Sequence, residues 1–225
     1  MPGQAAYNHP MQELNVIQLL VIMAPPLLLA ITLHEVAHGW MALRCGDTTA
    51  QAQGRLSLNP LRHIDPIGTV LVPALLAVFG GFIFGWAKPV PVNFHRLRQP
   101  KRDMALVALA GPGANLIMAL GWALAALLGH QAQTTLPWLG EPLMAMGVVG
   151  VDVNVMLGVL NLVPIPPLDG SRVLAGVLPN RYGEAMARLE PYGLIILVLL
   201  LASGLLNLMP IVATLRHWIL TLFFS

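Results

Sequence analysis

Residues 14–43 read LNVIQLLVIMAPPLLLAITLHEVAHGWMAL, a long apolar run that carries a cluster of three ionisable side chains near its end. The run exceeds the roughly 20 residues that an α-helix needs to cross a bilayer. Pro25 and Pro26 are expected to kink it partway. No basic residue precedes the run, so it lacks the n-region of a cleaved signal peptide and predicts a retained helix.

The composition of the whole chain agrees with this prediction. Of its 225 residues, 56% are hydrophobic and 10% are charged, whereas soluble domains have about 25% charged residues. A soluble domain is therefore excluded, and so is disorder, which requires low hydrophobicity and high charge. We expect an all-α integral membrane protein with about five to six transmembrane helices, forming a single polytopic domain over residues 1–225.

The basic residues fall in two blocks, at 44–102 and 172–188, with Arg216 alone beyond them. Such blocks are typical of loops held on the cytoplasmic face of a membrane, and not of a nucleic-acid-binding stripe. Because Arg44 directly follows the first apolar run, that end should be cytoplasmic and the N-terminus external. Cys45 is the only cysteine, so no disulfide forms within the chain.

Further apolar segments predict the remaining membrane helices. Basic residues flank segment 66–87 on both sides, and Pro73 and Gly80 can break it, so a re-entrant hairpin is favoured over a full crossing. A short extended segment is expected after the hairpin. The predicted spans are 104–129, 142–163 and 190–208, with a shorter segment at 210–224 that crosses partly or lies at the interface.

The ionisable cluster in the first run is His34-Glu35-Val36-Ala37-His38. Two histidines at i and i+4 share one face of a helix and can bind one zinc ion, and the intervening Glu35 can act as a general base. Packing of the two histidines against polar neighbours is the less favoured alternative. His34 lies ten residues before Arg44, about 15 Å of helix, which places the site inside the bilayer near its cytoplasmic face.

Catalytic zinc takes three protein ligands, so a third is needed. Two aspartates in apolar surroundings are candidates. Asp152 lies in the middle of a predicted span, where it could equally hydrogen-bond a neighbouring helix, and Asp169 follows a proline cluster. Spacing alone does not choose between them.

Three motifs in this order resemble the site-2 protease family of intramembrane zinc metalloproteases, in its short bacterial subgroup without PDZ or CBS domains. They are HEVAH in the first helix, AGPGAN at 110–115 and NLVPIPPLDG at 161–170. The resemblance covers about residues 30–190, and it implies a catalytic core at about 14–175 followed by C-terminal helices at about 190–224.

The resemblance also implies roles for individual residues. His34, His38 and Asp169 would hold one zinc ion per chain, with Glu35 as the general base. Further residues would bind substrate or steady the oxyanion. These are Asn161, Asn115 and Gly111. Without the resemblance, helix packing explains Gly111 and Asn115, and a helix cap explains Asn161.

The function implied is an endopeptidase that cleaves transmembrane segments of other proteins near the cytoplasmic side, in regulated intramembrane proteolysis. Its partners would be transmembrane protein substrates and membrane lipid, with no nucleic acid, in the bacterial inner membrane. The alternatives are a non-proteolytic metal-binding membrane protein and a divalent-metal transporter.

The sequence also supports predictions for residues outside the proposed zinc site. Segment 88–93, KPVPVN, is either an edge that pairs with an unwound substrate or a plain interfacial loop. Asp152 and Asn154 are candidates for hydrogen bonds between helices. Arg216 and His217 are expected to reach a lipid headgroup. Three loop histidines are expected at the solvent or interface: His63, His95 and His130.

Overall fold

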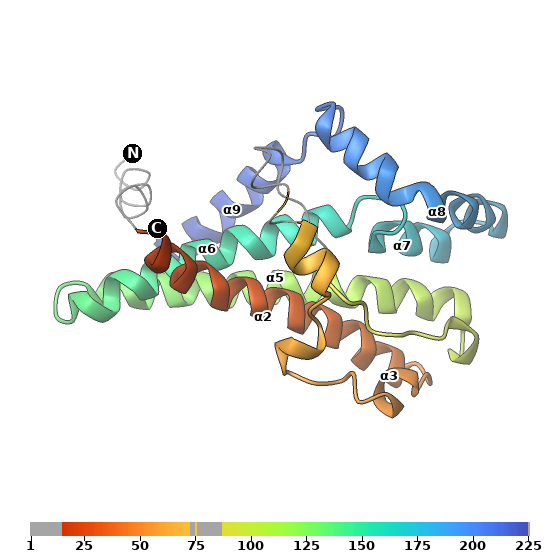
Figure 1. Ribbon diagram of the computed structural model, residues 1–225, viewed down its shortest axis with the longest axis horizontal. Coiled ribbons are helices and arrows are strands. Elements are labelled where there is room, and N and C mark those ends of the chain that lie inside the picture. The colour runs from red at the N-terminus through yellow and green to blue at the C-terminus, as the bar shows by residue number, and fades with distance from the viewer. Residues whose placement is uncertain (1–14, 73–74, 76–86, 225) are drawn as a thin grey trace. The chain divides into compact units, whose positions relative to one another are not determined.

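The computed structural model describes residues 15–72, 75 and 87–224, and every long element in this part of the chain is a helix (Figure 1). No strand occurs among these residues, which confirms the all-α prediction. The α-helices are α2 (Val16–Arg44), α3 (Thr49–Ala52), α5 (Pro100–Ala132), α6 (Pro137–Asn161), α7 (Asp169–Val177), α8 (Asn180–Ala202) and α9 (Met209–Phe224). Three short helical turns are η1 (Pro60–Arg62), η2 (Pro66–Leu71) and η3 (Phe94–Arg96).

Four of the described helices are long and apolar enough to cross a membrane: α2, α5, α6 and α8. α9 is apolar but shorter. The protein is therefore a membrane protein whose described part has four candidate spans, against the five to six expected for the whole chain. The predicted re-entrant hairpin at 66–87 falls largely on residues 73–74 and 76–86, which lie outside the described residues.

The bounds of the last long helix differ from the prediction. The expected span was 190–208, but α8 begins at Asn180 and ends at Ala202. Pro191 lies inside the helix without ending it. The helix stops where Gly204 adopts a positive φ of 73° and its N–H bonds back to the carbonyl of Leu201, the usual role of glycine after a helix.

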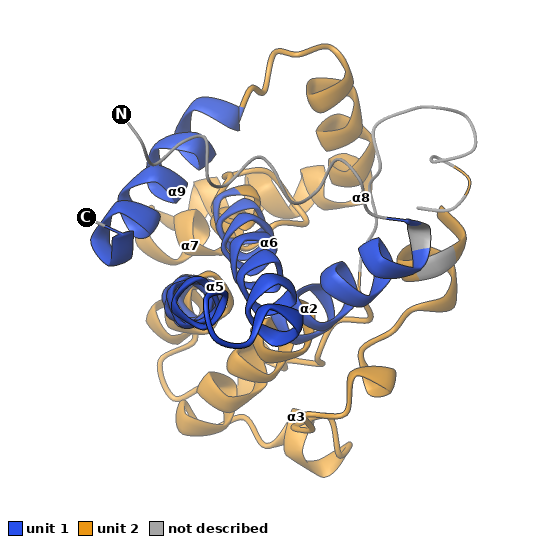
Figure 2. Ribbon diagram, turned by 90° about the vertical axis from the view of Figure 1, so that its left-hand side faces the viewer, with its two compact units in different colours: residues 1–30, 113–159, 208–225 blue, residues 31–112, 160–207 orange. Residues whose placement is uncertain are grey.

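The chain divides into two compact units, coloured separately in Figure 2. Unit 1 comprises residues 1–30, 113–159 and 208–225, and unit 2 comprises residues 31–112 and 160–207. The helices α2, α5 and α6 each contribute one end to each unit. Of the 12 lysines and arginines in the sequence, all but Arg216 fall in the ranges of unit 2.

Close packing and polar side-chain pairs hold the described helices of unit 1 together. A Cβ on Gly147 of α6 would lie 2.6 Å from Cα of Ala126 in α5, so the two helices touch through their backbones, as small residues allow. In the same unit the Asn115 side-chain amide donates to Oδ1 of Asn154 at 3.0 Å, and both residues are buried. This contact is the interhelical hydrogen bond that packing alone would predict.

Another polar pair of unit 1 joins α6 and α9. Nε of Arg216 donates to Oδ1 of Asp152 at 2.5 Å. Asp152 is thus neutralised by a cation of a neighbouring helix, and Arg216 does not extend freely to a headgroup as the sequence suggested. Ionisable residues in apolar helices usually pair in this way, because an unpaired charge there is costly.

Unit 2 has a small apolar core that fixes the C-terminal end of α2. Ala42 of α2, Val107 of α5 and Leu97, which directly follows η3, are all buried in it. Asp47, also buried, accepts from the N–H of Thr49 at 3.0 Å and from that of Asn93 at 2.6 Å. The end of α2 is therefore joined to the start of α5 and to the segment that precedes it.

Candidate metal centre

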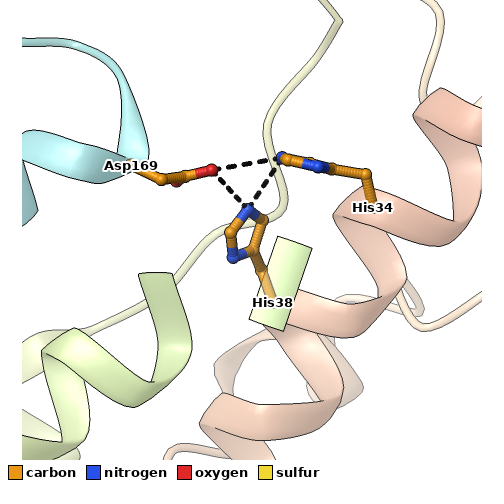
Figure 3. A group of neighbouring side chains, drawn as sticks. All are labelled: His34, His38 and Asp169. Atoms are coloured by element: carbon orange, nitrogen blue, oxygen red, sulfur yellow. Dashed lines mark hydrogen bonds and ion pairs between the residues drawn. The ribbon is translucent and has the colours of Figure 1, made fainter. Parts of the chain in front are cut away.

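Three side chains of unit 2 converge on one point, as Figure 3 shows. His34 and His38 come from adjacent turns of α2, and Asp169 is the first residue of α7. The two Nε2 atoms are 3.0 Å apart. Oδ2 of Asp169 is 3.3 Å from Nε2 of His34 and 3.2 Å from Nε2 of His38. The structure thus brings together the three residues that the family resemblance implied as zinc ligands.

The dimensions of this triangle suit a zinc ion. With Zn–N distances of about 2.0–2.1 Å, tetrahedral ligand atoms stand about 3.3–3.4 Å apart. All three residues are buried, with 8–9% of their surface exposed. Buried Oδ2 of Asp169 forms no hydrogen bond with the described part of the chain, and such an atom calls for a partner of another kind.

The hydrogen bond at Nδ1 of His38 also supports a zinc site. This nitrogen lies 2.7 Å from the carbonyl oxygen of Val107 in α5. A carbonyl only accepts, so Nδ1 carries the proton and Nε2 of the neutral ring presents a lone pair. Metal-binding histidines are commonly oriented by a hydrogen bond of this kind. A lone pair and a carboxylate oxygen thus meet at the triangle, an arrangement that a cation stabilises.

The charge state of Asp169 agrees with a ligand role. Burial by itself raises the pKa of this carboxyl, but contacts with His34 and His38 in their protonated forms outweigh burial and hold the pKa below its ordinary range. The group is therefore ionised at neutral pH, as a metal ligand must be.

Glycine is required beside the two histidines. A Cβ on Gly111 of α5 would lie 2.6 Å from Cε1 of both His34 and His38, and closer still to Nε2 of His38. Gly111 therefore packs directly against the two imidazoles. Asn115 lies one turn further along α5, where it contacts Asn154 within unit 1.

Close backbone packing also fixes the start of α7. A Cβ on Gly170 would lie 2.5 Å from the carbonyl carbon of Leu162. Gly193 of α8 lies against the carbonyl of Pro166, where a Cβ would overlap with the oxygen. Asn161, the last residue of α6, is half-buried and directly precedes Leu162. The two ends of the NLVPIPPLDG motif are therefore neighbours in space.

The candidate general base is oriented by the main chain. Glu35 is half-buried on α2, and its Oε2 accepts from the N–H of Val90 at 2.7 Å. The sequence did not predict this contact. Val90 stands between Pro89 and Pro91 and so carries the one main-chain N–H of residues 89–91, but no local pattern links it to Glu35, 55 positions earlier.

The prediction for His63 was wrong. The sequence placed it at the solvent or interface, but it is 1% exposed, and its Nε2 lies 2.8 Å from the carbonyl oxygen of Ser57. The loop from Ser57 to His63 closes on itself, with Asn59 capping η1, and this closure buries the ring.

Curated relatives now decide the family. The chain is 38% identical over 200 residues to a Bacillus subtilis protein named "Putative zinc metalloprotease YwhC", covering 88% of each chain. It is 32% identical over 201 residues to Rip2 of Mycolicibacterium smegmatis, which carries the same description, covering 87% of this chain and 72% of that one. The Mycobacterium tuberculosis Rip2 is 31% identical over 180 residues.

The chain belongs to the site-2 protease family. As a site-2 protease it is a zinc metalloprotease, and zinc is its cofactor. No protein-family model matches it, and no solved structure does so at a significant level. The family and the cofactor expected from the three sequence motifs are thus confirmed.

Proposed function

We propose that this site-2 protease is an intramembrane endopeptidase that hydrolyses peptide bonds within transmembrane segments of other proteins, near the cytoplasmic side. The observation that carries the proposal is the triangle of His34, His38 and Asp169 at one end of a long apolar helix. A metal centre built on a candidate membrane span is suited to a substrate that also spans the membrane.

The depth of the site is argued from α2 itself. His38 lies six residues, about 9 Å, before the helix ends at Arg44. The guanidinium of Arg44 stacks 4.7 Å above the ring of Trp40, which is exposed. Tryptophan and arginine at a helix end are typical of the membrane–water interface. We therefore infer a site within the bilayer and close to the face at which α2 ends.

The orientation follows from the basic residues. They are concentrated in unit 2, to which α2 contributes its C-terminal end and α5 its N-terminal end. The connection between α5 and α6, residues 133–136, has none. By the positive-inside rule we infer a cytoplasmic unit 2, an external N-terminus and multiple crossings of the bacterial inner membrane.

The chemistry is divided among few side chains. His34, His38 and Asp169 would hold zinc, which when bound activates water and polarises the scissile carbonyl. Glu35 takes the proton of the attacking water and delivers it to the leaving amine. Asn161 and Asn115 are proposed to bind the substrate backbone or steady the oxyanion, and Gly111 keeps the space beside the two imidazoles open.

The substrate must unwind locally before it can react, because the carbonyls of a helix are already hydrogen-bonded and shielded by side chains. We infer that substrates are transmembrane proteins whose spans unwind readily, for example at glycine or proline.

The decisive experiment is Glu35→Gln in protein reconstituted with a tagged single-span reporter. Because Gln keeps an oxygen that can accept from Val90 but is not a base, we expect zinc content to stay near one per chain. Cleavage should fall by roughly 10²–10⁴-fold. Glu141→Gln, which changes an exposed carboxylate of α6, is the matched control and should leave both unchanged.

Unchanged cleavage by Glu35→Gln would contradict the proposed mechanism. Zinc uptake into sealed vesicles by the unmodified protein and by Glu35→Gln, without cleavage of the reporter by either, would favour a transporter instead. Mapping the reporter fragments by mass spectrometry locates the cut bond, and a cut outside the apolar span would contradict intramembrane cleavage.

A further inference from the structure

Segment 88–93 is tied to three different parts of unit 2 through its main-chain N–H groups. The N–H of Lys88 donates to the carbonyl of His63 at 2.9 Å. The N–H of Val90 donates to the carboxylate of Glu35. The N–H of Asn93 donates to the carboxylate of Asp47. Pro89 and Pro91 have no N–H. Each of the three N–H groups, of Lys88, Val90 and Asn93, is therefore hydrogen-bonded within the protein. The N–H of Val90 bonds the candidate general base.

One arginine holds the backbone just before Val90. Nη2 of Arg55 donates to the carbonyl of Lys88 at 2.9 Å and to that of Pro89 at 3.3 Å. The planar guanidinium suits such a double contact, which the single ammonium of lysine reproduces poorly. Because the two carbonyls directly precede Val90, Arg55 limits where the Val90 N–H can lie.

Side-chain packing reinforces this arrangement. Val90 is 7% exposed. A Cβ on Gly39, one turn after Glu35 on α2, would lie 2.9 Å from Cγ1 of Val90 and 2.6 Å from Cδ2 of Leu56. Both Val90 and Leu56, the neighbour of Arg55, thus pack on the stretch of α2 that carries Glu35.

The far end of the segment is anchored by an ionised carboxylate. Burial raises the pKa of Asp47, but the hydrogen bonds from Thr49 and from the N–H of Asn93 lower it more, so the group stays charged. The segment is therefore held on both sides of Val90, by Arg55 before it and by Asp47 after it.

We propose that Arg55 is a positioning residue for catalysis, which holds the carbonyls of Lys88 and Pro89 so that the Val90 N–H orients the carboxylate of Glu35. This inference rests on the proposed role of Glu35 as general base. It also changes the role expected for KPVPVN: Val90, whose N–H could have paired with an unwound substrate, serves the catalytic carboxylate instead.

The test compares Arg55→Lys and Arg55→Gln with Arg62→Gln. Arg62 is the matched control, because its guanidinium bonds the carbonyl of Gly54 in the same loop. We expect both Arg55 variants to keep zinc near one per chain and to lose roughly ten- to a hundredfold in kcat with KM unchanged. Arg62→Gln should keep the kcat of the unmodified protein.

Two further measurements separate positioning from a purely structural role. Glu35→Asp has a shorter side chain, which withdraws the carboxylate from Val90. Adding Arg55→Lys to Glu35→Asp should therefore lower kcat little further. Amide hydrogen exchange at residues 88–93 should be faster in both Arg55 variants than in the Arg62 control. Should Arg55→Gln lose its fold or its zinc, the milder Arg55→Lys decides the question.

Three outcomes would overturn the inference: unchanged kcat in Arg55→Lys, a rise in KM alone, or full additivity with Glu35→Asp. A rise in KM alone would restore the substrate-pairing role of the segment. Failure of the proposed function is recognised separately, because Glu35→Gln would then cleave normally whatever Arg55 does.

Discussion

Each unit of this protease places an aspartate against neighbouring polar groups, with opposite results. In unit 1, Asp152 accepts a hydrogen bond from Arg216, so its charge is compensated by the protein. In unit 2, Asp169 meets two imidazoles, and its Oδ2 has no hydrogen-bond donor among the described residues. A paired carboxylate stabilises helix contacts, whereas a carboxylate that meets two further ligand atoms forms a metal site.

The largest expected effect distinguishes these two aspartates directly. Asp169→Ala removes one of three ligands, so zinc content should fall close to zero and cleavage of the reporter should be lost. Asp152→Asn should keep zinc near one per chain and most of the activity. Metal analysis of the purified variants measures the zinc content, and the cleavage assay measures the activity. Equal zinc loss in the two variants would remove the distinction between the aspartates.

A smaller effect is expected from a single methyl group at Gly111. Gly111→Ala forces both imidazoles to move, so zinc affinity should fall about 10–100-fold, as it does when groups that orient metal ligands are changed. Gly113→Ala on the same helix is the control, because a Cβ there meets nothing within 4 Å. Competition with a zinc chelator measures both. Wild-type affinity in Gly111→Ala would mean that the imidazoles adjust freely.

Packing behind the third ligand should matter less. Gly193→Ala pushes against the carbonyl of Pro166 and so displaces the turn before Asp169; we expect a several-fold loss of zinc affinity. In the control Gly183→Ala, on the same helix, the new Cβ makes an ordinary 3.6 Å contact with Ala175. Chelator competition is again the measurement. If the two variants behave alike, α8 does not set the position of Asp169.

The smallest effect concerns unit 1. Arg216→Gln leaves Asp152 without its cation, and about a third to a half of the two side chains is exposed. The expected cost is therefore reduced to about 1 kcal/mol of unfolding free energy, with zinc content unchanged. Adding Asp152→Asn should recover part of it in thermal unfolding. Zinc loss in Arg216→Gln would instead link the ion pair to the metal centre.

Much of this arrangement was predictable from the sequence. The apolar runs predicted the long helices, because a bilayer demands about 20 apolar residues per crossing. Spacing in HEVAH predicted that His34 and His38 share a helix face, which the structure reproduces. Choosing Asp169 over Asp152 required the family resemblance, because periodicity does not reveal which aspartate has a cation nearby.

Other features depend on tertiary contacts, and the sequence did not predict them. His63 was placed at the solvent or interface because loop histidines are usually exposed, but the loop closes over its ring. The contact between Val90 and Glu35 joins residues 55 positions apart, beyond the reach of any local pattern. The start of α8 was missed because its first turns are polar, whereas apolar runs were used to place the spans.

The triangle in unit 2 also joins distant parts of the chain, since about 130 residues separate His38 from Asp169. An ion bound by both acts as a reversible cross-link that closes this loop. Its binding energy then contributes to folding as well as to catalysis. With nine residues, α7 is too short to persist as a helix alone. A chelator should therefore loosen α7 first, while the 29-residue α2 keeps its shape.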